Sequence, residues 1–271
     1  NLSAVAVTPS EHFSSVHYTG QGTGGSGQSI TGVGFQPDFT WFKIRDSAGS
    51  HALFNVLMGV NKALASNQTA GEYTAASNAD LISWDSDGFT LGVPEDWASV
   101  NGSGYSAGSR HVAWNWKAGG SGSANTDGTI NTTVSANVDA GFSIVSYTGN
   151  STAFATVGHG LNKAPEMIIM KNRDDGQPWL VYHKGSGTTG TTVDGLPEYW
   201  MLQLQTSGAR ANFSVDTIWG STATTFKIDQ NGASQLTNDS SRNYIAYCFH
   251  SVRGYSRAGS WINSGANDGT F

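Results

Sequence analysis

Short runs rich in aromatic and β-branched residues recur along the whole chain, and clusters of Gly, Ser, Asn and Asp separate them. Within most runs apolar and polar side chains alternate, and this period of two predicts β-strands. In the first half we expect strands at 12–18, 39–44, 52–57, 80–84, 89–93 and 110–117. In the second half we expect them at 142–147, 167–171, 179–183, 199–205, 224–229 and 243–249. Residues 61–67 form the one segment expected to make a helical turn, so the pattern predicts an all-β protein.

The sequence DSDG at 85–88 stands between two of the expected strands. A short polar segment that ends in glycine is typical of a tight hairpin, because glycine adopts a positive φ at little cost. We therefore expect the two strands on either side of it to pair.

The same pattern of strands occurs twice. Three blocks of the first half, HFSSVHYTG at 12–20, PDFTWFKIRD at 37–46 and VAWNW at 112–116, return in the same order in the second half. Their counterparts are GFSIVSYTG at 141–149, PEMIIMKNRD at 165–174 and IAYCF at 245–249. A repeat of this length defines the folding unit. The sequence thus predicts an internal duplication that gives two tandem jelly-roll-like β-sandwiches.

This duplication divides the chain into five parts. They are an N-terminal arm (1–10), a first β-sandwich repeat (11–119), a linker (120–139), a second β-sandwich repeat (140–253) and a C-terminal segment (254–271). The linker is rich in Gly, Ser, Asn and Thr and is expected to be semi-flexible. The C-terminal segment resembles the start of a third repeat, which favours a longer array, and a strand exchanged with a neighbouring unit is the alternative.

Composition narrows the range of partners and ligands. The net charge is −6 with 14 Lys and Arg and no basic stripe, so neither nucleic acid nor membrane is expected as a partner. Cys248 lies in an expected buried strand and is assigned to the core. The seven histidines have no metal-ligand spacing, and the aspartates near 85–87 and 174–175 are typical of turns, so no metal and no cofactor is expected.

Three motifs match catalytic signatures without the structural context that those signatures need. GQGTGG at 20–25 precedes a loop, whereas a dinucleotide fingerprint opens a helix. GYSAG at 104–108 lies in a Gly/Ser loop, whereas a nucleophile elbow joins a strand to a helix. The acid pairs at 95–96 and 174–175 are adjacent in loop-like sequence, whereas a glycosidase needs two carboxylates opposed across the sugar bond. The sequence therefore predicts a protein that is not an enzyme.

Aromatic residues outside the expected strand cores are the candidate binding residues. They are Trp97, Tyr105, Trp179 and Trp219, whereas Trp41, Trp84, Trp114 and Trp116 are assigned to the core. Exposed aromatic rings stack on sugars and anchor protein interfaces. Glycan binding, a subunit interface and simple capping of the sandwich ends are the three interpretations that remain open.

Each half ends a strand with the motif Lys-x-Arg-Asp. Its residues are Lys43, Arg45 and Asp46 in the first half and Lys171, Arg173 and Asp174 in the second. We interpret the motif as structural, with an Arg–Asp pair that holds the following loop.

The motifs FSxVxYTG, GFxPDFxWxKxRD, DSDGFxLG and HVAWNWKAG of the first half resemble a tandem domain of virion structural proteins from marine bacteriophages, including cyanophages. In the second half LNKAPEMI at 161–168 and RNYIAYCFHSV at 242–252 are similar to the same domain. The resemblance covers nearly the whole chain apart from 120–139, and it implies concanavalin-like sandwiches. It supplies no catalytic residue, and the DSDG loop has no clear counterpart in the second half.

Together these observations predict a non-enzymatic virion structural protein on the particle exterior, in a tail fibre, head fibre or capsid appendage. It would act as a β-sandwich spacer whose partners are other copies of itself and other virion proteins, and host-surface glycans are a further expected ligand. A carbohydrate-binding adhesin or lectin module is the first alternative. A polysaccharide-degrading β-sandwich glycosidase is the second.

Overall fold

The computed structural model describes residues 7–94, 100–102, 104–185, 200–209, 211–212, 218–228 and 236–259. Antiparallel strands make up its regular structure, and the only helical element in these ranges is the 3₁₀ turn η1 (Pro9–Glu11). Within the same ranges, no helix has the length and apolar character needed to cross a membrane. The all-β prediction is therefore confirmed.

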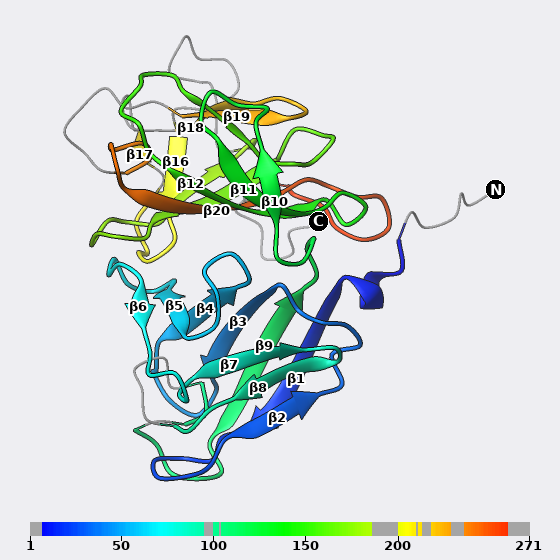
Figure 1. The fold of residues 1–271 in the computed structure, drawn as a ribbon, viewed down its shortest axis with the longest axis vertical. Helices are drawn as coiled ribbons and strands as arrows, with labels where there is room; N and C mark the ends of the chain where they lie inside the picture. The colour runs from blue at the N-terminus through cyan, green and yellow to red at the C-terminus, as the bar shows by residue number, and fades with distance from the viewer. Residues whose placement is uncertain are drawn as a thin grey trace, which may run out of the picture.

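The first unit consists of a six-stranded and a three-stranded sheet (Figure 1). In spatial order the larger sheet contains β1 (Phe13–Thr19), β9 (Arg110–Trp116), β3 (Phe39–Ile44), β4 (His51–Asn55), β5 (Lys62–Ala65) and β6 (Tyr73–Thr74). The smaller sheet contains β2 (Gln28–Thr31), β8 (Gly88–Leu91) and β7 (Leu81–Asp85). Their inner faces bury a common core that includes Phe42, Phe54 and Phe89. The unit is thus sandwich-like.

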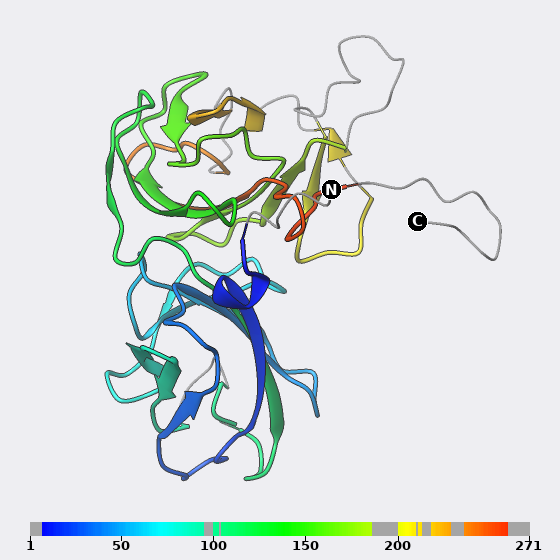
Figure 2. The ribbon, with the colours of Figure 1, turned by 90° about the vertical axis from the view of Figure 1, so that its right-hand side faces the viewer.

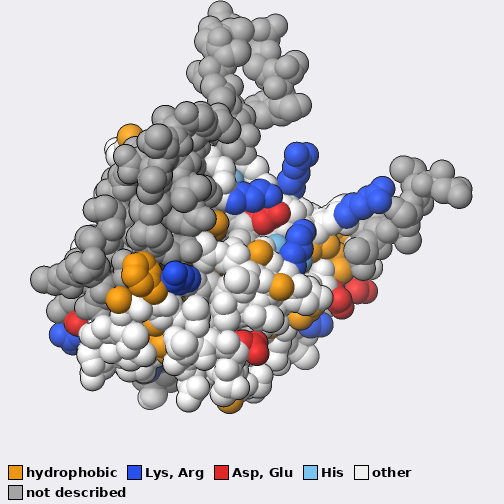
Figure 3. All heavy atoms as spheres, turned by 90° about the horizontal axis from the view of Figure 1, so that it is seen from above, with side chains coloured by type: hydrophobic (Ala, Val, Ile, Leu, Met, Phe, Trp, Pro, Cys, Tyr) orange, Lys and Arg blue, Asp and Glu red, His pale blue; other side chains and the backbone are white. Residues whose placement is uncertain are grey.

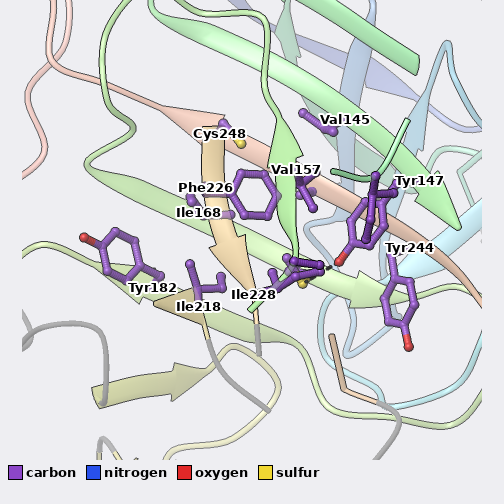
Figure 4. Close-up of a cluster of buried hydrophobic side chains, with 14 of the residues drawn as sticks. Val145, Tyr147, Val157, Ile168, Tyr182, Ile218, Phe226, Ile228, Tyr244 and Cys248 are labelled. Carbon is purple, nitrogen blue, oxygen red and sulfur yellow. Dashed lines mark hydrogen bonds between the residues drawn. The ribbon is translucent and has the colours of Figure 1, made fainter. Parts of the chain in front are cut away.

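The second unit has an eight-stranded and a three-stranded sheet. The larger sheet contains β10 (Ser123–Asn125), β11 (Thr132–Asn137), β12 (Phe142–Thr148), β20 (Asn243–Phe249), β14 (Met167–Asn172), β15 (Leu180–His183), β16 (Trp200–Gln203) and β17 (Ala211–Asn212). The smaller one contains β13 (Thr156–Gly158), β19 (Thr225–Ile228) and β18 (Ile218–Ser221). Figure 4 shows the core between them, where Tyr147, Phe226 and Cys248 belong to one buried cluster. Cys248 is a core residue, as predicted.

The two units have corresponding strand orders. The order β1-β9-β3-β4-β5-β6 of the first sheet corresponds to β12-β20-β14-β15-β16-β17 of the second, and β2-β8-β7 corresponds to β13-β19-β18. Registers correspond as well, since Phe13 pairs with Trp116 as Phe142 pairs with Phe249. In addition, the second sheet carries β10 and β11 beyond β12, whereas β1 is the outermost described strand of its sheet.

Every range predicted to be a strand overlaps one, but two other predictions are wrong. The predicted linker at 120–139 contains β10 and β11, which extend the second sheet. Its alternation at Thr132–Asn137 places Val134 in the core, so a composition rich in small polar residues did not prevent strand formation. Within residues 61–67, Lys62–Ala65 form β5 and not a helical turn, because pairing with β4 overrides the weak helical pattern.

The DSDG hairpin is present as predicted. Asp85 pairs with Gly88, whose φ of 149° is disfavoured for residues with a side chain. The Asp87 carboxylate accepts hydrogen bonds from the amides of Gly34 and Gly32, and these bonds lower the pKa of Asp87. In the second unit the hairpin between β18 and β19 occupies the corresponding place, with a turn at 222–224.

Acid is expected to destabilise the first unit through His111. Burial lowers the pKa of His111 to about 4, with Asp46 acting against this effect and Lys43 adding to it. An unfolded histidine has a pKa near 6.5, so the stability is full above about pH 6.5 and is lost as the pH falls towards 4. We expect the free energy of unfolding to fall by about 2–3 kcal/mol across this window on account of His111.

Urea unfolding at pH 7 and pH 4 measures this loss. The variant His111→Gln should lose less stability than the wild type on acidification, while His17→Gln, at an exposed position of β1, should behave like the wild type. Equal losses in the wild type and in His111→Gln would contradict the assignment. Other histidines whose pKa burial lowers, such as His159, account for the part of the pH dependence that remains.

Candidate functional site

The two units lie one against the other (Figures 1 and 2), and side chains from the outer faces of their large sheets form a third apolar cluster, which we call the joint. Its fully enclosed members are Phe39, Leu53, Met58, Leu64 and Ala118 of the first unit and Phe142, Ile144, Trp179, Ile245 and Tyr247 of the second. None of them is more than 7% exposed. The alternation of the strands produces this arrangement, because side chains two residues apart on one strand share a face. The two units therefore share one hydrophobic core.

Two hydrogen bonds cross the joint inside this apolar environment. The Asn55 side-chain amide donates to the Tyr247 hydroxyl at 2.9 Å. The indole N–H of Trp179 donates to the carbonyl oxygen of Ala65, also at 2.9 Å. Polar groups buried among apolar side chains are costly to leave unpaired, so both bonds fix the orientation of the units.

An ion pair closes one side of the joint. The Arg173 guanidinium contacts the Glu72 carboxylate at 2.6 Å, and the two side chains are 14% and 13% exposed. A second contact joins Arg173 Nε to the same carboxylate oxygen at 2.8 Å, and the Glu72 amide donates to the Arg173 carbonyl oxygen. Lys62 contacts the other carboxylate oxygen at 3.2 Å. The bridge is therefore held by backbone as well as side chains.

Beside the joint, the outer face of the first sheet forms an open hollow of about 360 Å³, which we call the aromatic groove. It is lined by Phe13, Trp41, Lys43, His51, Trp114 and Trp116. These six side chains are neither fully buried nor fully exposed. Rings pack against one another in pairs: Trp41 lies edge-on to Trp114 at 6.4 Å, and Phe13 lies 4.8 Å from Trp116. The groove thus presents a preformed aromatic surface.

The polar groups of the groove are Lys43 and His51. The Lys43 ammonium donates to the carbonyl oxygens of Ile44 at 2.5 Å and Ser47 at 2.9 Å, which leaves one N–H beyond these two bonds. Burial and the charge of Lys43 lower the pKa of His51. A ligand would therefore meet aromatic faces with a single fixed positive charge at the rim.

The groove continues towards the second unit. A narrower hollow of about 140 Å³ shares Trp41 and Trp116 with it and is lined on the other side by residues such as Met167 and Phe249. Met167 and Phe249 also line a third hollow, which reaches His183 and Arg257. Residues of both units therefore line one chain of hollows.

Charged side chains gather on the second unit. Figure 3 shows Lys and Arg side chains near acidic ones on the upper side of the molecule in Figure 1. One hollow lined by Lys163, Glu166, Lys184, Arg253 and Arg257 has such a composition. Burial raises the pKa of Glu166, but hydrogen bonds from Lys184 and Ser251 outweigh it and bring this pKa to about 2. Glu166 is thus a paired carboxylate.

The four aromatic residues predicted to bind ligands are not brought together. Trp179 is fully buried in the joint, so it is not an exposed aromatic residue that could bind a ligand. Tyr105 is partly buried in a loop, where its backbone contacts Thr23 and Gly102. Trp219 belongs to β18, but its side chain, like all of Trp97, lies outside the described residues.

Conversely, the tryptophans assigned to the core are partly exposed. Trp41, Trp114 and Trp116 line the aromatic groove, and Trp84 packs at the margin of the first core. In β9 both faces are rich in apolar or small residues, so alternation alone did not reveal which face is inward. Once the joint is known, the repeat identifies the outward face, since Trp114 corresponds to Tyr247 and Trp116 to Phe249, on the face that forms the joint.

The Lys-x-Arg-Asp motif ties each strand end to its surroundings, but not by the predicted Arg–Asp pair. Lys171 donates to the carbonyl oxygens of Asn172 and Asp175, as Lys43 does to those of Ile44 and Ser47. Burial lowers the pKa of Lys171 to about 8.

The aspartates bind the first residue of the last strand of each unit. Asp46 accepts bonds from the backbone and guanidinium of Arg110, which lower the pKa of Asp46, and Asp174 accepts bonds from the backbone and side chain of Asn243. Arg45 is exposed, whereas its counterpart Arg173 pairs with Glu72 across the joint. The arginine of the motif therefore has a different environment in each unit: it is exposed in the first and bridges the two units in the second.

Among the described residues, no group of three or more His, Cys, Asp or Glu side chains could hold a metal ion. A family model described as a domain of unknown function (DUF7483) matches residues 8–271. No curated protein and no solved structure matches the chain.

Proposed function

The chain belongs to the DUF7483 family of domains of unknown function, and we propose that it is a non-enzymatic structural protein of a virion exterior that acts as a rigid spacer. The joint is the observation that carries this proposal. Interfaces between domains that move are typically polar and modest in size. Here a shared apolar cluster, two buried hydrogen bonds and a largely buried ion pair fix one unit on the other.

The position on a virion rests on the resemblance of the sequence motifs described above to a domain of marine-phage virion proteins. We also propose that the two units are jelly-roll-like sandwiches that arose by internal duplication. The matching registers of β1 with β9 and of β12 with β20 support the duplication. Tail fibre, head fibre and capsid appendage all need a part that keeps its length under load.

Immunogold electron microscopy tests this placement. Antibodies raised against the recombinant chain are applied to intact particles of a marine phage whose genome encodes it. We expect gold on an external appendage or on the capsid surface. Label confined to infected cells, with purified particles unlabelled, would contradict a role on the virion exterior.

Adhesion to a host-surface glycan is the second candidate function, and the aromatic groove is the observation that favours it. Its volume of about 360 Å³ lies in the range of small-ligand pockets, and indole faces suit the apolar faces of pyranose rings. If glycans bind there, Trp114→Ala should weaken binding at least about tenfold, as loss of a central aromatic anchor does. Titration of the labelled protein onto host cells, with and without free host polysaccharide, measures this effect.

Phe154→Ala is the matched control for that experiment. Phe154 is 46% exposed and packs under Lys227 in the second unit, so its loss should leave glycan binding unchanged. Binding by the wild type that Trp114→Ala does not weaken would exclude the groove as the glycan site. Release of reducing ends in the same samples would instead favour the glycosidase alternative.

A further inference from the structure

The aromatic groove occupies the same place on the first sheet as the face that the second sheet buries in the joint. The registers of the central strands make Phe13 the counterpart of Phe142 and Trp114 the counterpart of Tyr247. Along the next strands, Trp41 corresponds to Ile169 and Lys43 to Lys171. The residue before β15, Trp179, similarly corresponds to His51.

The side chains at these matched positions differ in how much of their surface is exposed. In the second unit Phe142, Ile144 and Tyr247 are 2%, 0% and 0% exposed, because the first unit lies on them. In the first unit their counterparts Phe13 and Trp114 are partly exposed, and Ser15 is exposed. The first unit therefore covers this face of the second sheet. Among the described residues, no other part of the chain covers the corresponding positions of the first sheet in the same way.

The surface that covers the second unit also has a counterpart. In the joint the first unit contributes Leu53 and Leu64, which pair with each other on β4 and β5. Their counterparts on β15 and β16 are Val181 and Leu202, which pair in the same way. Leu64 is 0% exposed, whereas Leu202 is 40% exposed and is one of the few large exposed hydrophobic side chains among the described residues.

We propose that the aromatic groove is a docking surface for a second copy of this chain, whose second unit inserts the surface around Leu202. The contact between copies would thus repeat the joint within one chain. This proposal rests on the proposed spacer function and names its partner.

The sequence after β20 repeats part of the sequence that precedes the second unit. Residues 266–271 read ANDGTF, and residues 124–130, which contain the end of β10 and the turn after it, read ANTDGTI. The pattern that leads into the second unit therefore recurs after it. A contact between a groove on one copy and a different surface on the next is heterologous, so it propagates head to tail.

Sedimentation velocity of the full chain tests the proposal through two variants. Leu202→Asp places a charge on the inserting surface, and Trp114→Thr removes an aromatic ring from the groove with a residue that suits a strand. The wild type should self-associate, and each variant alone should dissociate at least about tenfold more readily, since each loses an apolar anchor. Phe154→Asp, at another exposed apolar position, should associate like the wild type.

Mixing the two variants identifies the geometry. Each variant keeps the surface that the other has lost, so an equimolar mixture should form a one-to-one dimer and nothing larger. A wild type that remains monomeric up to about 100 µM, a range in which weak specific contacts form, would overturn the proposal. So would a mixture that stays monomeric, or a Leu202→Asp variant that associates like the wild type. These outcomes would leave the rigid joint within one chain untouched, so failure of the docking proposal is distinguishable from failure of the spacer function.

Discussion

Replacing Trp179 with alanine should lower the free energy of unfolding by about 3–5 kcal/mol, the range found for large aromatic side chains in cores. Trp179 is fully buried in the joint and has the largest side chain among its fully enclosed residues. Its removal opens a cavity between the units and leaves the Ala65 carbonyl oxygen without the indole N–H. Urea unfolding followed by circular dichroism measures the change.

Two further variants separate the contributions. Trp179→Phe keeps most of the ring and should cost less than Trp179→Ala, because the main loss is then the single hydrogen bond, worth about 1 kcal/mol. Phe154→Ala, an exposed aromatic position outside the joint, should change stability by less than about 1 kcal/mol. A small loss for Trp179→Ala, similar to that of Phe154→Ala, would show that the joint does not contribute to stability.

Replacing Arg173 with methionine should lower the free energy of unfolding by about 2–3 kcal/mol, since it leaves the largely buried Glu72 carboxylate with only the contact to the more exposed Lys62. The matched control is Arg45→Met, at the corresponding position of the first unit, where the side chain is exposed. That change should stay within about 0.5 kcal/mol. Chemical denaturation of both variants measures the difference.

The pair Glu72→Gln and Arg173→Met then forms a double-mutant cycle. Because the two groups contact each other directly, the loss in the double variant should be smaller than the sum of the single losses. Additive losses, or equal losses for Arg45→Met and Arg173→Met, would contradict the role of Arg173 as a bridge between units.

Local patterns were enough to predict the strands. Alternation and turn chemistry placed a strand in each expected range and identified the hairpin at Gly88, because both depend on residues that are neighbours in sequence. The same local logic failed at 120–139, where pairing with β12 rather than composition decides the structure. Pairing between two segments, even consecutive ones, is not visible in the composition of either segment alone.

The candidate site required information that the pattern of one strand lacks. In β9, Trp114 and Trp116 lie on one face, and His111, Ala113 and Asn115 on the other, so both faces suited a core. The burial of Trp179 depends on the first unit, more than a hundred residues away in sequence, whose Ala65 carbonyl accepts its N–H. The joint therefore had to be seen before exposed and buried tryptophans could be told apart.

The difference between Lys43 and Lys171 has the same origin. Both ammonium groups donate to carbonyl oxygens one and four residues ahead, which a repeated motif already suggests. Only Lys171 is fully buried, because the joint covers that part of the second sheet. The repeated motif thus gives the two lysines the same local hydrogen bonds, whereas packing between the units decides how far each lysine is buried.

The most direct test of the rigid joint is the distance distribution between spin labels on the two units, measured by pulsed electron paramagnetic resonance. Labels at Thr31→Cys and Thr224→Cys occupy exposed positions on the smaller sheets of the first and second units. The native Cys248 is fully buried, and burial raises the pKa of its thiol, so it should not compete for the label. A single narrow distribution, unchanged between low and high salt, is the predicted result. A broad or bimodal distribution would show that the units move independently, and would contradict a rigid spacer.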